Sequence, residues 1–195
     1  MSASKGRGFS LIELMVTLVI VAVLLRVGVP SLRTLLIKSQ LSGEVQDFYG
    51  AISYARSEAI KRGNYVSICK RKTDTSCGGG VGDTTTWSNG WIIFTNADND
   101  DPATIDTGEP ILRVVPALPD GYTLNASSNF ASYITFDRFG MANRIGTFVF
   151  CANGDRTTAK AIIVTRARPR IATDTNGNGI PETDNGTDIA SCTSP

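Results

Sequence analysis

The sequence predicts an α+β protein in which a long N-terminal α-helix packs on a largely antiparallel β-sheet domain. Three observations lead to this fold class. An apolar run lies near the start of the chain, an amphipathic helical pattern follows it, and short strand-like segments fill the rest. These strand-like segments come after the helix and do not alternate with further helices, as βαβ units would require. We therefore expect an antiparallel sheet.

The first element is an apolar run from Phe9 to Val29, in which Glu13 and Arg26 are the charged residues. At roughly 1.5 Å per residue this run is about 31 Å long as a helix, which is enough to cross a bilayer. Arg26 lies near the end of the run, where its charge can reach the interface. An unpaired carboxylate at Glu13 costs about 2.5–3.5 kcal/mol on insertion scales. We expect a transmembrane helix in which Glu13 has a cationic partner.

The leader before this run suggests a source for the cation. It is short and basic, with Lys5 and Arg7 as its charges, so the positive-inside rule holds it in the cytoplasm and exports the rest of the chain. An ordinary secretory signal has a shorter apolar segment, of about 7–15 residues, and small residues at its cleavage site. Cleavage between Gly8 and Phe9 would place a new ammonium group on Phe9, one helical turn from Glu13. The alternative is a simple signal anchor with an accidental glutamate.

The helix is expected to continue from residue 30 to residue 62. Apolar residues recur at alternating steps of four and three, which is typical of a helix face that packs against a sheet. This stripe consists of Leu41, Val45, Phe48, Ile52, Ala55 and Ala59. Its short length and the small residues at its end disfavour a coiled coil. Gly63 and Asn64 are expected to end the helix.

Residues 63–195 are expected to form one β-rich domain with a disulfide-bonded tail. Clusters of glycine, proline, asparagine and aspartate separate its apolar segments. The expected strands are Tyr65–Lys70, Gly90–Thr95, Ile111–Val115, Ser132–Phe136, Thr147–Cys151 and Ala161–Thr165. The sequence contains no low-complexity tract and no second long apolar run, so one domain after one long helix is the simplest organisation.

Four cysteines agree with an exported domain: Cys69, Cys77, Cys151 and Cys192. An even number of cysteines in an oxidising compartment predicts two disulfides. Metal binding is disfavoured, because the chain has no Cys-x-x-Cys pair and no histidine. Sequence alone permits every connectivity. We expect Cys69 with Cys77, since the loop between them is short, and Cys151 with Cys192 as the late pair.

The segment from Gly8 to Leu14, Gly-Phe-Ser-Leu-Ile-Glu-Leu, resembles the processing site of type IV prepilins and type II secretion pseudopilins. The resemblance implies a type IV pilin fold, cleavage of leader residues 1–8 and N-methylation of Phe9 by a prepilin peptidase. It also implies that the helix of residues 9–29 packs into a filament core with other minor and major pilins. Glu13 would there meet the Phe9 ammonium of its own or a neighbouring subunit.

The same resemblance implies a location. The chain would first be a single-pass protein of the bacterial inner membrane, with its C-terminal domain in the periplasm. It would then be assembled into a pilus at the cell surface.

Motifs in the body of the chain are similar to those of the FimU, FimT and H-type pseudopilin group. They are the run Tyr54–Ala59, the Cys69–Cys77 loop, the run Gly90–Phe94 and the run Phe136–Gly140. In this group, FimU-like members are minor pilins that start pilus assembly at the tip, FimT-like members are competence pilins that bind DNA, and H-type members serve type II secretion. The cysteine-bonded loop and the Gly-Trp pair favour the pilus members.

An arginine-rich stretch is the candidate for DNA binding. In an extended chain Arg166, Arg168 and Arg170 would lie on one face over roughly 13 Å, and Pro169 would place them at a sheet edge. FimT-like proteins carry a Gly-Arg-x-Arg motif, but Ala167 replaces the glycine here. The formal charge of +1 becomes −1 once the two cations of the leader are removed, and an acidic tail follows the arginines. A solvated edge is the alternative, and we favour it.

The tail contains a candidate calcium loop. Asp174, Asn176, Asn178 and Glu182 offer oxygen ligands, and a glycine occupies the sixth position, as in EF-hand loops. Few of these ligands are carboxylates, Asn185 replaces the usual glutamate, and no helical pattern flanks the loop. A turn held by the last disulfide is therefore the simpler interpretation, and calcium is the one cofactor that the sequence suggests. A second acidic turn, expected to be a solvated loop, contains Asp98, Asp100 and Asp101.

The sequence gives little support for an enzyme. It has no histidine, no Gly-x-Ser-x-Gly elbow and no phosphate-binding loop, so catalysis would need a carboxylate site without a motif. We expect a structural subunit with no small-molecule substrate. The leading prediction is a type IV minor pilin, the second is a DNA-binding competence pilin, and the third is an H-type pseudopilin of type II secretion.

Overall fold

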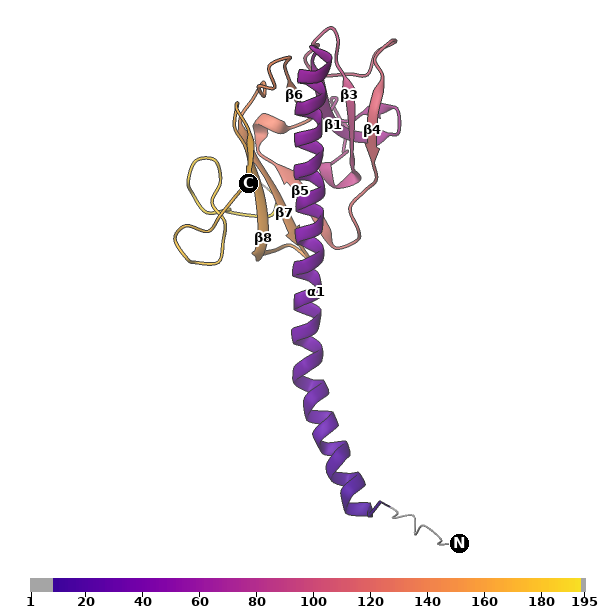
Figure 1. Ribbon diagram of the computed structural model, residues 1–195, viewed down its shortest axis with the longest axis vertical. Helices are drawn as coiled ribbons and strands as arrows, with labels where there is room; N and C mark the ends of the chain where they lie inside the picture. Colours follow the sequence, from indigo (N-terminus) through magenta and orange to yellow (C-terminus); the bar gives the residue numbers. More distant parts are fainter. Residues whose placement is uncertain (1–8, 194–195) are drawn as a thin grey trace, which may run out of the picture. The chain divides into compact units, whose positions relative to one another are not determined.

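Helix α1 begins the structure, and every described strand follows it along the chain (Figure 1). The computed structural model describes residues 9–193, apart from the side chains of residues 27, 28, 30 and 31. The chain divides into two units, Met1–Ser39 and Gln40–Pro195. Helix α1 (Leu11–Arg62) contributes to both units.

The N-terminal part of α1 begins at a serine cap. The Ser10 hydroxyl accepts the N–H of Glu13 at 3.2 Å, and the Ser10 carbonyl accepts the N–H groups of Glu13 and Leu14 at 3.1 and 3.2 Å. These bonds satisfy donors that a helix start otherwise leaves free. The large apolar side chains of this part are exposed, and they are Leu11, Ile12, Leu14, Met15, Val16, Leu18, Val19, Ile20, Val21, Val23, Leu24, Leu25, Val29, Leu32, Leu35 and Leu36.

A search of the described residues for membrane-crossing helices found none with the required length and apolar character. The transmembrane segment of residues 9–29 stays a prediction from the sequence.

The C-terminal part of α1 buries the predicted apolar stripe. Every stripe residue is buried, and Ala51 belongs to the same buried face. The helix ends at Arg62, after which Gly63 has a φ of 62°. The N–H of Gly63 donates to the carbonyl of Ile60 at 3.3 Å, and the N–H of Asn64 donates to that of Ala59 at 3.2 Å. This helix end needs a left-handed residue, and glycine supplies it without strain, as the sequence predicts.

Two antiparallel sheets follow the helix, where the sequence predicted one. The first sheet contains β1 (Val66–Thr73), β2 (Ser76–Cys77), β3 (Trp91–Thr95), β4 (Ile111–Val115) and β6 (Tyr133–Phe136). Strand β1 is its centre, because β3, β6 and β2 all pair with it, and β4 extends the sheet from β3.

The second sheet has the strand order β5-β7-β8-β9, again with antiparallel pairs. Its strands are β5 (Tyr122–Ala126), β7 (Gly146–Ala152), β8 (Asp155–Val164) and β9 (Pro169–Ile171). Two short 3₁₀ helices, η1 (Trp87–Asn89) and η2 (Ser128–Phe130), precede β3 and β6. In Figure 1, β7 and β8 lie on one side of α1, and β3 and β4 lie on the other.

The sequence analysis missed three strands and misplaced the start of a fourth. Strands β2, β5 and β9 were not predicted, and β8 begins at Asp155 instead of Ala161. Asn153 and Gly154, with φ of 52° and 70°, form the turn between β7 and β8. An Asn-Gly pair between two strands is a strong hairpin signal, so this start was readable from the sequence. The two-residue β2 and the proline-containing β9 lack such a signal.

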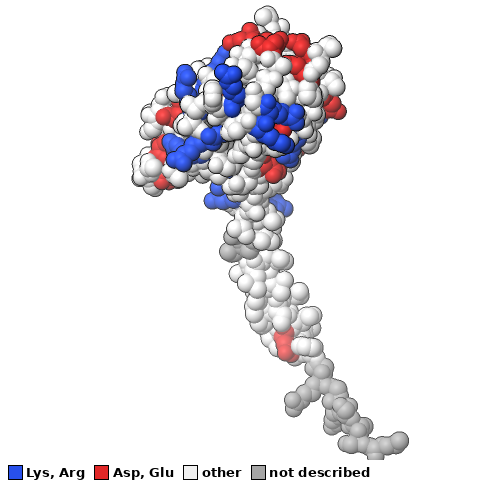
Figure 2. All heavy atoms as spheres, turned by 45° about the horizontal axis from the view of Figure 1, so that its top comes forward, with Lys and Arg blue, Asp and Glu red and all other residues white. Residues whose placement is uncertain are grey.

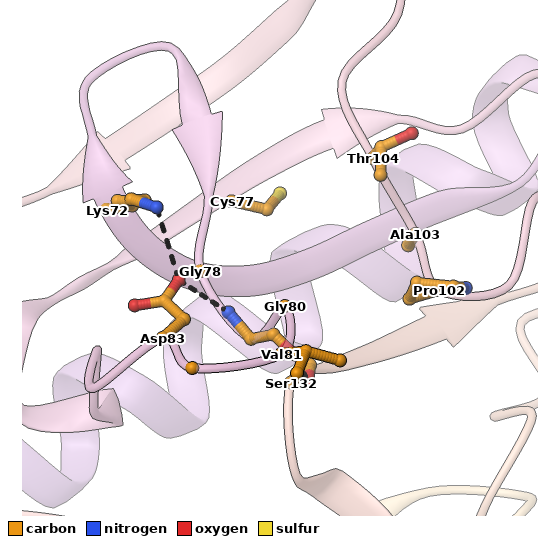
Figure 3. Close-up of a pocket in the computed structure, with 12 residues that line it drawn as sticks. Lys72, Cys77, Gly78, Gly80, Val81, Asp83, Pro102, Ala103, Thr104 and Ser132 are labelled. Carbon is orange, nitrogen blue, oxygen red and sulfur yellow. Dashed lines mark hydrogen bonds and ion pairs between the residues drawn. The ribbon is translucent and has the colours of Figure 1, made fainter.

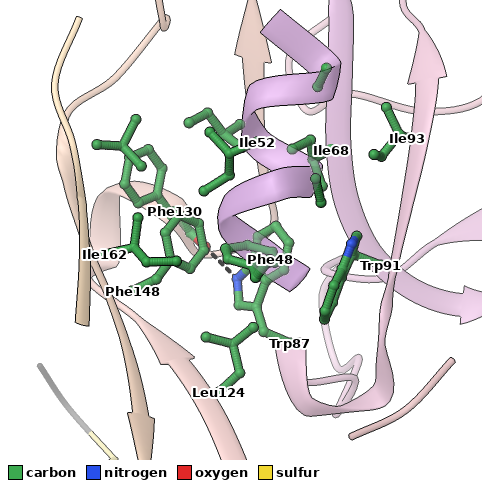
Figure 4. Packing of buried hydrophobic residues seen from close by; sticks show 14 of the residues in the cluster. Phe48, Ile52, Ile68, Trp87, Trp91, Ile93, Leu124, Phe130, Phe148 and Ile162 are labelled. Carbon is green, nitrogen blue, oxygen red and sulfur yellow. Dashed lines mark hydrogen bonds between the residues drawn. The ribbon is translucent and has the colours of Figure 1, made fainter. Parts of the chain in front are cut away.

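The main core lies between the helix and the two sheets (Figure 4). Phe48 of α1 makes edge-to-face contacts with Trp91 and Phe148, at ring-centroid distances of 4.7 and 4.8 Å. The Trp87 indole N–H donates to the carbonyl of Phe130 at 2.8 Å, so its polar atom is satisfied inside the core. Phe48 therefore connects the helix to both sheets.

The tail after β9 covers the outer face of the second sheet. Side chains of β7 alternate, so that Phe148 and Phe150 join the main core while Val149 and Cys151 face the tail. The tail contributes Ile189 and Cys192 to a second apolar cluster there. Disulfides join Cys69 to Cys77 and Cys151 to Cys192, the pairing that we expected.

Candidate functional site

The predicted processing site lies at the boundary of the described chain. Gly8 lies outside the described residues, whereas Phe9 is described and 83% exposed. Glu13 is exposed in the first turn of α1, where the helix dipole favours a carboxylate. No other described residue forms an ion pair with Glu13. Cleavage, methylation and the partner of Glu13 therefore stay predictions.

The three predicted DNA-binding arginines do not share one extended face. Arg166 and Arg168 lie in the turn between β8 and β9, and Arg170 lies on β9. The Thr165 hydroxyl donates to the carbonyl of Arg168 at 2.8 Å and closes this turn. Pro169 lies at a sheet edge as expected, since it begins β9, the last strand of its sheet. The regular spacing of an extended chain does not occur, because the chain reverses here to pair with β8.

A groove lies between this turn and α1. It has a volume of about 400 Å³ and is lined by Tyr49, Ser53, Arg56, Ser57, Ile60, Arg168 and Pro169. The sequence analysis did not single out Arg56, which donates from Nε to the carbonyl of Gly140 at 2.9 Å. A Cβ at Gly140 would meet the Ile60 Cδ1 at 2.7 Å. The turn around Gly140 therefore packs closely on α1 at the end of the groove.

The predicted calcium loop is held by its own hydrogen bonds. The Asp174 carboxylate accepts the N–H groups of Gly177 and Gly179 at 2.7 and 2.6 Å. The Glu182 carboxylate accepts the Thr175 hydroxyl at 2.6 Å, and this bond lowers the pKa of Glu182 below its ordinary value. Asn176 and Asn178 donate their side-chain amides to Asp188 instead of offering only oxygen. The loop is explained without an ion, and calcium binding stays a prediction.

The second acidic turn gathers three carboxylates. Asp98, Asp100 and Asp106 have carboxylate oxygens within 4.8 Å of one another. Asp101 points elsewhere and accepts the Tyr133 hydroxyl at 2.5 Å and Arg144 at 3.0 Å. Burial raises the pKa of Tyr133 to about 12, and the bond to Asp101 adds to this rise. This contact fixes the loop to β6, while the other carboxylates face solvent or loop N–H groups.

A polar pocket of about 330 Å³ lies beside the first disulfide (Figure 3). Asp83 occupies its wall, where it accepts the Gly79 N–H at 3.0 Å and lies 3.7 Å from the Lys72 Nζ. Hydrogen bonds from Thr85 hold the pKa of Asp83 well below its usual range. A Cβ at Gly79 would lie 2.2 Å from the Ser132 hydroxyl. Gly79 is therefore explained by the close packing of this loop on Ser132.

Two family models match the chain. The model described as type II transport protein GspH matches residues 44–167, which is more than half of the chain. The model described as prokaryotic N-terminal methylation motif matches residues 3–25. Strand β9 and the tail lie beyond the GspH match. No curated protein matches the chain.

Two solved structures are similar to this chain. Both are crystal structures of the type IV minor pilin FimU from Pseudomonas aeruginosa, strain PAO1. The first is 21% identical with a TM-score of 0.50, and the match covers 69% of this chain and 90% of that chain. The second, in another crystal form, is 20% identical with a TM-score of 0.49 and covers 68% and 92%.

These comparisons agree with the architecture of a long helix packed on antiparallel sheets. Pilins and pseudopilins are structural subunits, and the methylation motif implies a membrane-anchored subunit that assembles with other pilins into a filament. The chain belongs to the GspH family, and it is a type IV minor pilin or a GspH-type pseudopilin.

Proposed function

We propose that this protein is a structural minor pilin of a type IV pilus, which acts in initiation or tip assembly after a prepilin peptidase has removed residues 1–8 and methylated Phe9. One observation carries the filament role. The apolar side chains of α1 from Leu11 to Leu36 are exposed in the isolated chain. So large an apolar surface needs a membrane or neighbouring subunits to cover it.

Packing in a filament explains Glu13 as well. Its carboxylate is exposed at the start of α1, among apolar side chains. Once neighbouring helices bury it, it needs a cation, and the new ammonium on Phe9 of a neighbouring subunit is suited to this role. The charge pair would then set the axial register of the helices.

Two observations favour a pilus over a type II secretion pseudopilus. The fold matches 90% of the length of the minor pilin FimU. The Cys69–Cys77 disulfide and the Gly90-Trp91 pair are features by which the sequence resembles pilus members. The family match to GspH keeps the secretion role as the alternative.

Deletion of the gene tests the choice. We expect cells without the protein to lose surface pili, seen by electron microscopy, while they still secrete type II substrates. Complementation with the full chain should restore pili. Loss of secretion with normal pili would assign the protein to the pseudopilus.

DNA binding is a second candidate function, because of the exposed arginines. Arg166, Arg168 and Arg170 are exposed, and none of them forms an ion pair with another described residue. Against this, the turn between β8 and β9 removes the regular spacing that successive phosphates would require.

A further inference from the structure

The groove between α1 and the turn from β8 to β9 is rich in arginine. Arg56 and Arg168 line it, and the N–H of Ala142 donates to the carbonyl of Arg166 at 2.9 Å, which fixes a third arginine beside it. Several other cations of the domain have carboxylate partners, such as Arg62 with Glu58 at 2.6 Å. Arg166 and Arg168 have no such partner among the described residues. The groove therefore has an unbalanced positive charge.

An exposed phenylalanine precedes Gly140, the residue that packs on Arg56 and Ile60 of the groove. Phe139 is 70% exposed, and the guanidinium of Arg138 lies 5.2 Å from the centre of its ring. The Asp137 carboxylate accepts the N–H groups of Phe139 and Met141 at 2.9 and 2.8 Å. Gly140, packed on Ile60, holds the other side of the turn. The backbone that presents the aromatic ring is thus fixed, and Ile60 and Met141 are themselves half-exposed.

We propose that this surface, the arginine groove with Phe139, docks an acidic segment of a neighbouring filament subunit, in which carboxylates flank an aliphatic or aromatic side chain. The inference rests on the proposed function, since it names a contact within the filament. Arginine pairs with carboxylates through two parallel hydrogen bonds, and the apolar side chain of the partner would pack on Phe139 and Ile60.

The composition of the surface favours a protein partner over nucleic acid. The two cations that line the groove, Arg56 and Arg168, are arginines, and Tyr49 lines it as well, while Phe139 is exposed on the turn that packs on Arg56 and Ile60. Arginine, aromatic residues and methionine are enriched at protein interfaces, whereas lysine is depleted there. Figure 2 shows Lys and Arg side chains gathered over one face of the domain, with Asp and Glu along its upper edge. An acidic partner segment complements Arg168 of the groove, which has no carboxylate partner among the described residues.

Photo-crosslinking in the full chain tests the proposal. Benzoylphenylalanine replaces Phe139 in cells that make the filament, and mass spectrometry identifies the peptide that crosslinks after irradiation. We expect an acidic peptide of another pilin-type subunit. The control position is Val81, which is fully exposed on the glycine-rich loop away from the groove. A crosslink at position 139 no stronger than at position 81, a crosslink to DNA, or a peptide without carboxylates overturns the proposal.

Charge reversal adds a second measurement. Arg168→Glu should lower the crosslink yield about tenfold, since like charges now face each other. Arg113→Glu, the same change at an exposed position of β4, should leave the yield within about twofold of the wild type. Replacement of the identified partner carboxylate by lysine should restore the yield in the Arg168→Glu background. Equal yields for Arg168→Glu and Arg113→Glu, or no restoration, would contradict the proposal.

A failure of the groove proposal can be distinguished from a failure of the proposed pilin function. The filament role is supported if the protein is recovered in filaments and Glu13→Ala excludes it from them. In that case, a crosslink yield that is unchanged in Arg168→Glu contradicts the groove proposal alone. If the wild-type protein is absent from filaments, both proposals fall.

Discussion

At the scale of single residues, the exposed arginines distinguish a structural pilin from a DNA-binding pilin. Their side chains are free of carboxylate partners within the described part of the chain. Arg166 and Arg168 lie on a turn and Arg170 lies on β9, so a straight duplex would not meet all of them at regular intervals. The acidic tail begins directly after β9, with Asp174. Electrostatic attraction to DNA is therefore weakened at the arginines that the sequence offered as a candidate DNA-binding site.

We expect the purified protein to show no salt-dependent binding to duplex DNA at low salt. The reason is that the acidic tail repels DNA phosphates and offsets the attraction of the arginines. The arginines also lack the regular spacing that successive phosphates would require. Fluorescence anisotropy over a series of salt concentrations measures this directly. If DNA binding does occur, the logarithm of the binding constant should fall against the logarithm of the salt concentration with a slope of about −0.9 for each neutralised phosphate. The binding can be assigned to the arginines only if their replacement removes it.

The matched variants decide that case. Replacing Arg166, Arg168 and Arg170 by glutamine should flatten the salt slope by about two to three units, whereas Arg113→Gln should change it by no more than one. DNA binding that disappears only in the triple variant would support a function in DNA uptake.

At the scale of elements, the second sheet is sandwiched between the helix and the tail. Phe148 and Phe150 of β7 face α1, and Val149 and Cys151 face Ile189 and the rest of the tail. The described part of the tail, up to residue 193, has no strand after β9, and few apolar side chains hold it. The Cys151–Cys192 disulfide, with a sequence separation of 41 residues, therefore limits its freedom.

Removal of this disulfide by Cys151→Ser with Cys192→Ser should destabilise the domain by about 4 kcal/mol in the chain-entropy model. The control is Cys69→Ser with Cys77→Ser, which opens a loop with a separation of 8 residues and should cost about 2.5 kcal/mol. Denaturant unfolding measures both values. A larger loss for the short loop would show that packing around Cys69, and not chain entropy, dominates.

At the scale of the whole molecule, the N-terminal segment and the domain differ in how their apolar side chains are covered. The domain buries its own core around Phe48, while the N-terminal part of α1 leaves its apolar side chains exposed. Only a membrane or other subunits can cover those side chains. Processing after Gly8 would replace the basic leader by a single ammonium group beside Glu13. This change would favour packing of the helix among other subunits over its anchoring in the membrane.

Intact-mass analysis of the membrane-extracted protein tests this change. We expect the loss of residues 1–8 and the gain of one methyl group on Phe9. Glu13→Ala should be processed in the same way, because Glu13 lies after the cleaved bond and acts in assembly. A mature protein that begins at Met1 would contradict the pilin function.

Local patterns were sufficient for much of the fold. The stripe from Leu41 to Ala59 repeats with the helical period and is buried as predicted, because helix periodicity depends on neighbouring residues alone. The helix end at Gly63 and both disulfides agree with the sequence for the same reason, since a left-handed turn and an even set of exported cysteines have local or compositional signals.

Only the tertiary structure decided how the strands pair and which side chains meet. The split into two sheets, and the reversal of the chain at Arg166 and Arg168, depend on contacts between residues far apart in sequence. The groove depends on them too, because Arg56 comes from α1 and Gly140 from a turn whose separation from it is 84 residues. The sequence by itself determined the long helix, most of the strands and the family resemblance. Folding determined that the turn with the exposed Phe139 packs on the helix that lines the arginine groove, since long-range packing has no period along the chain.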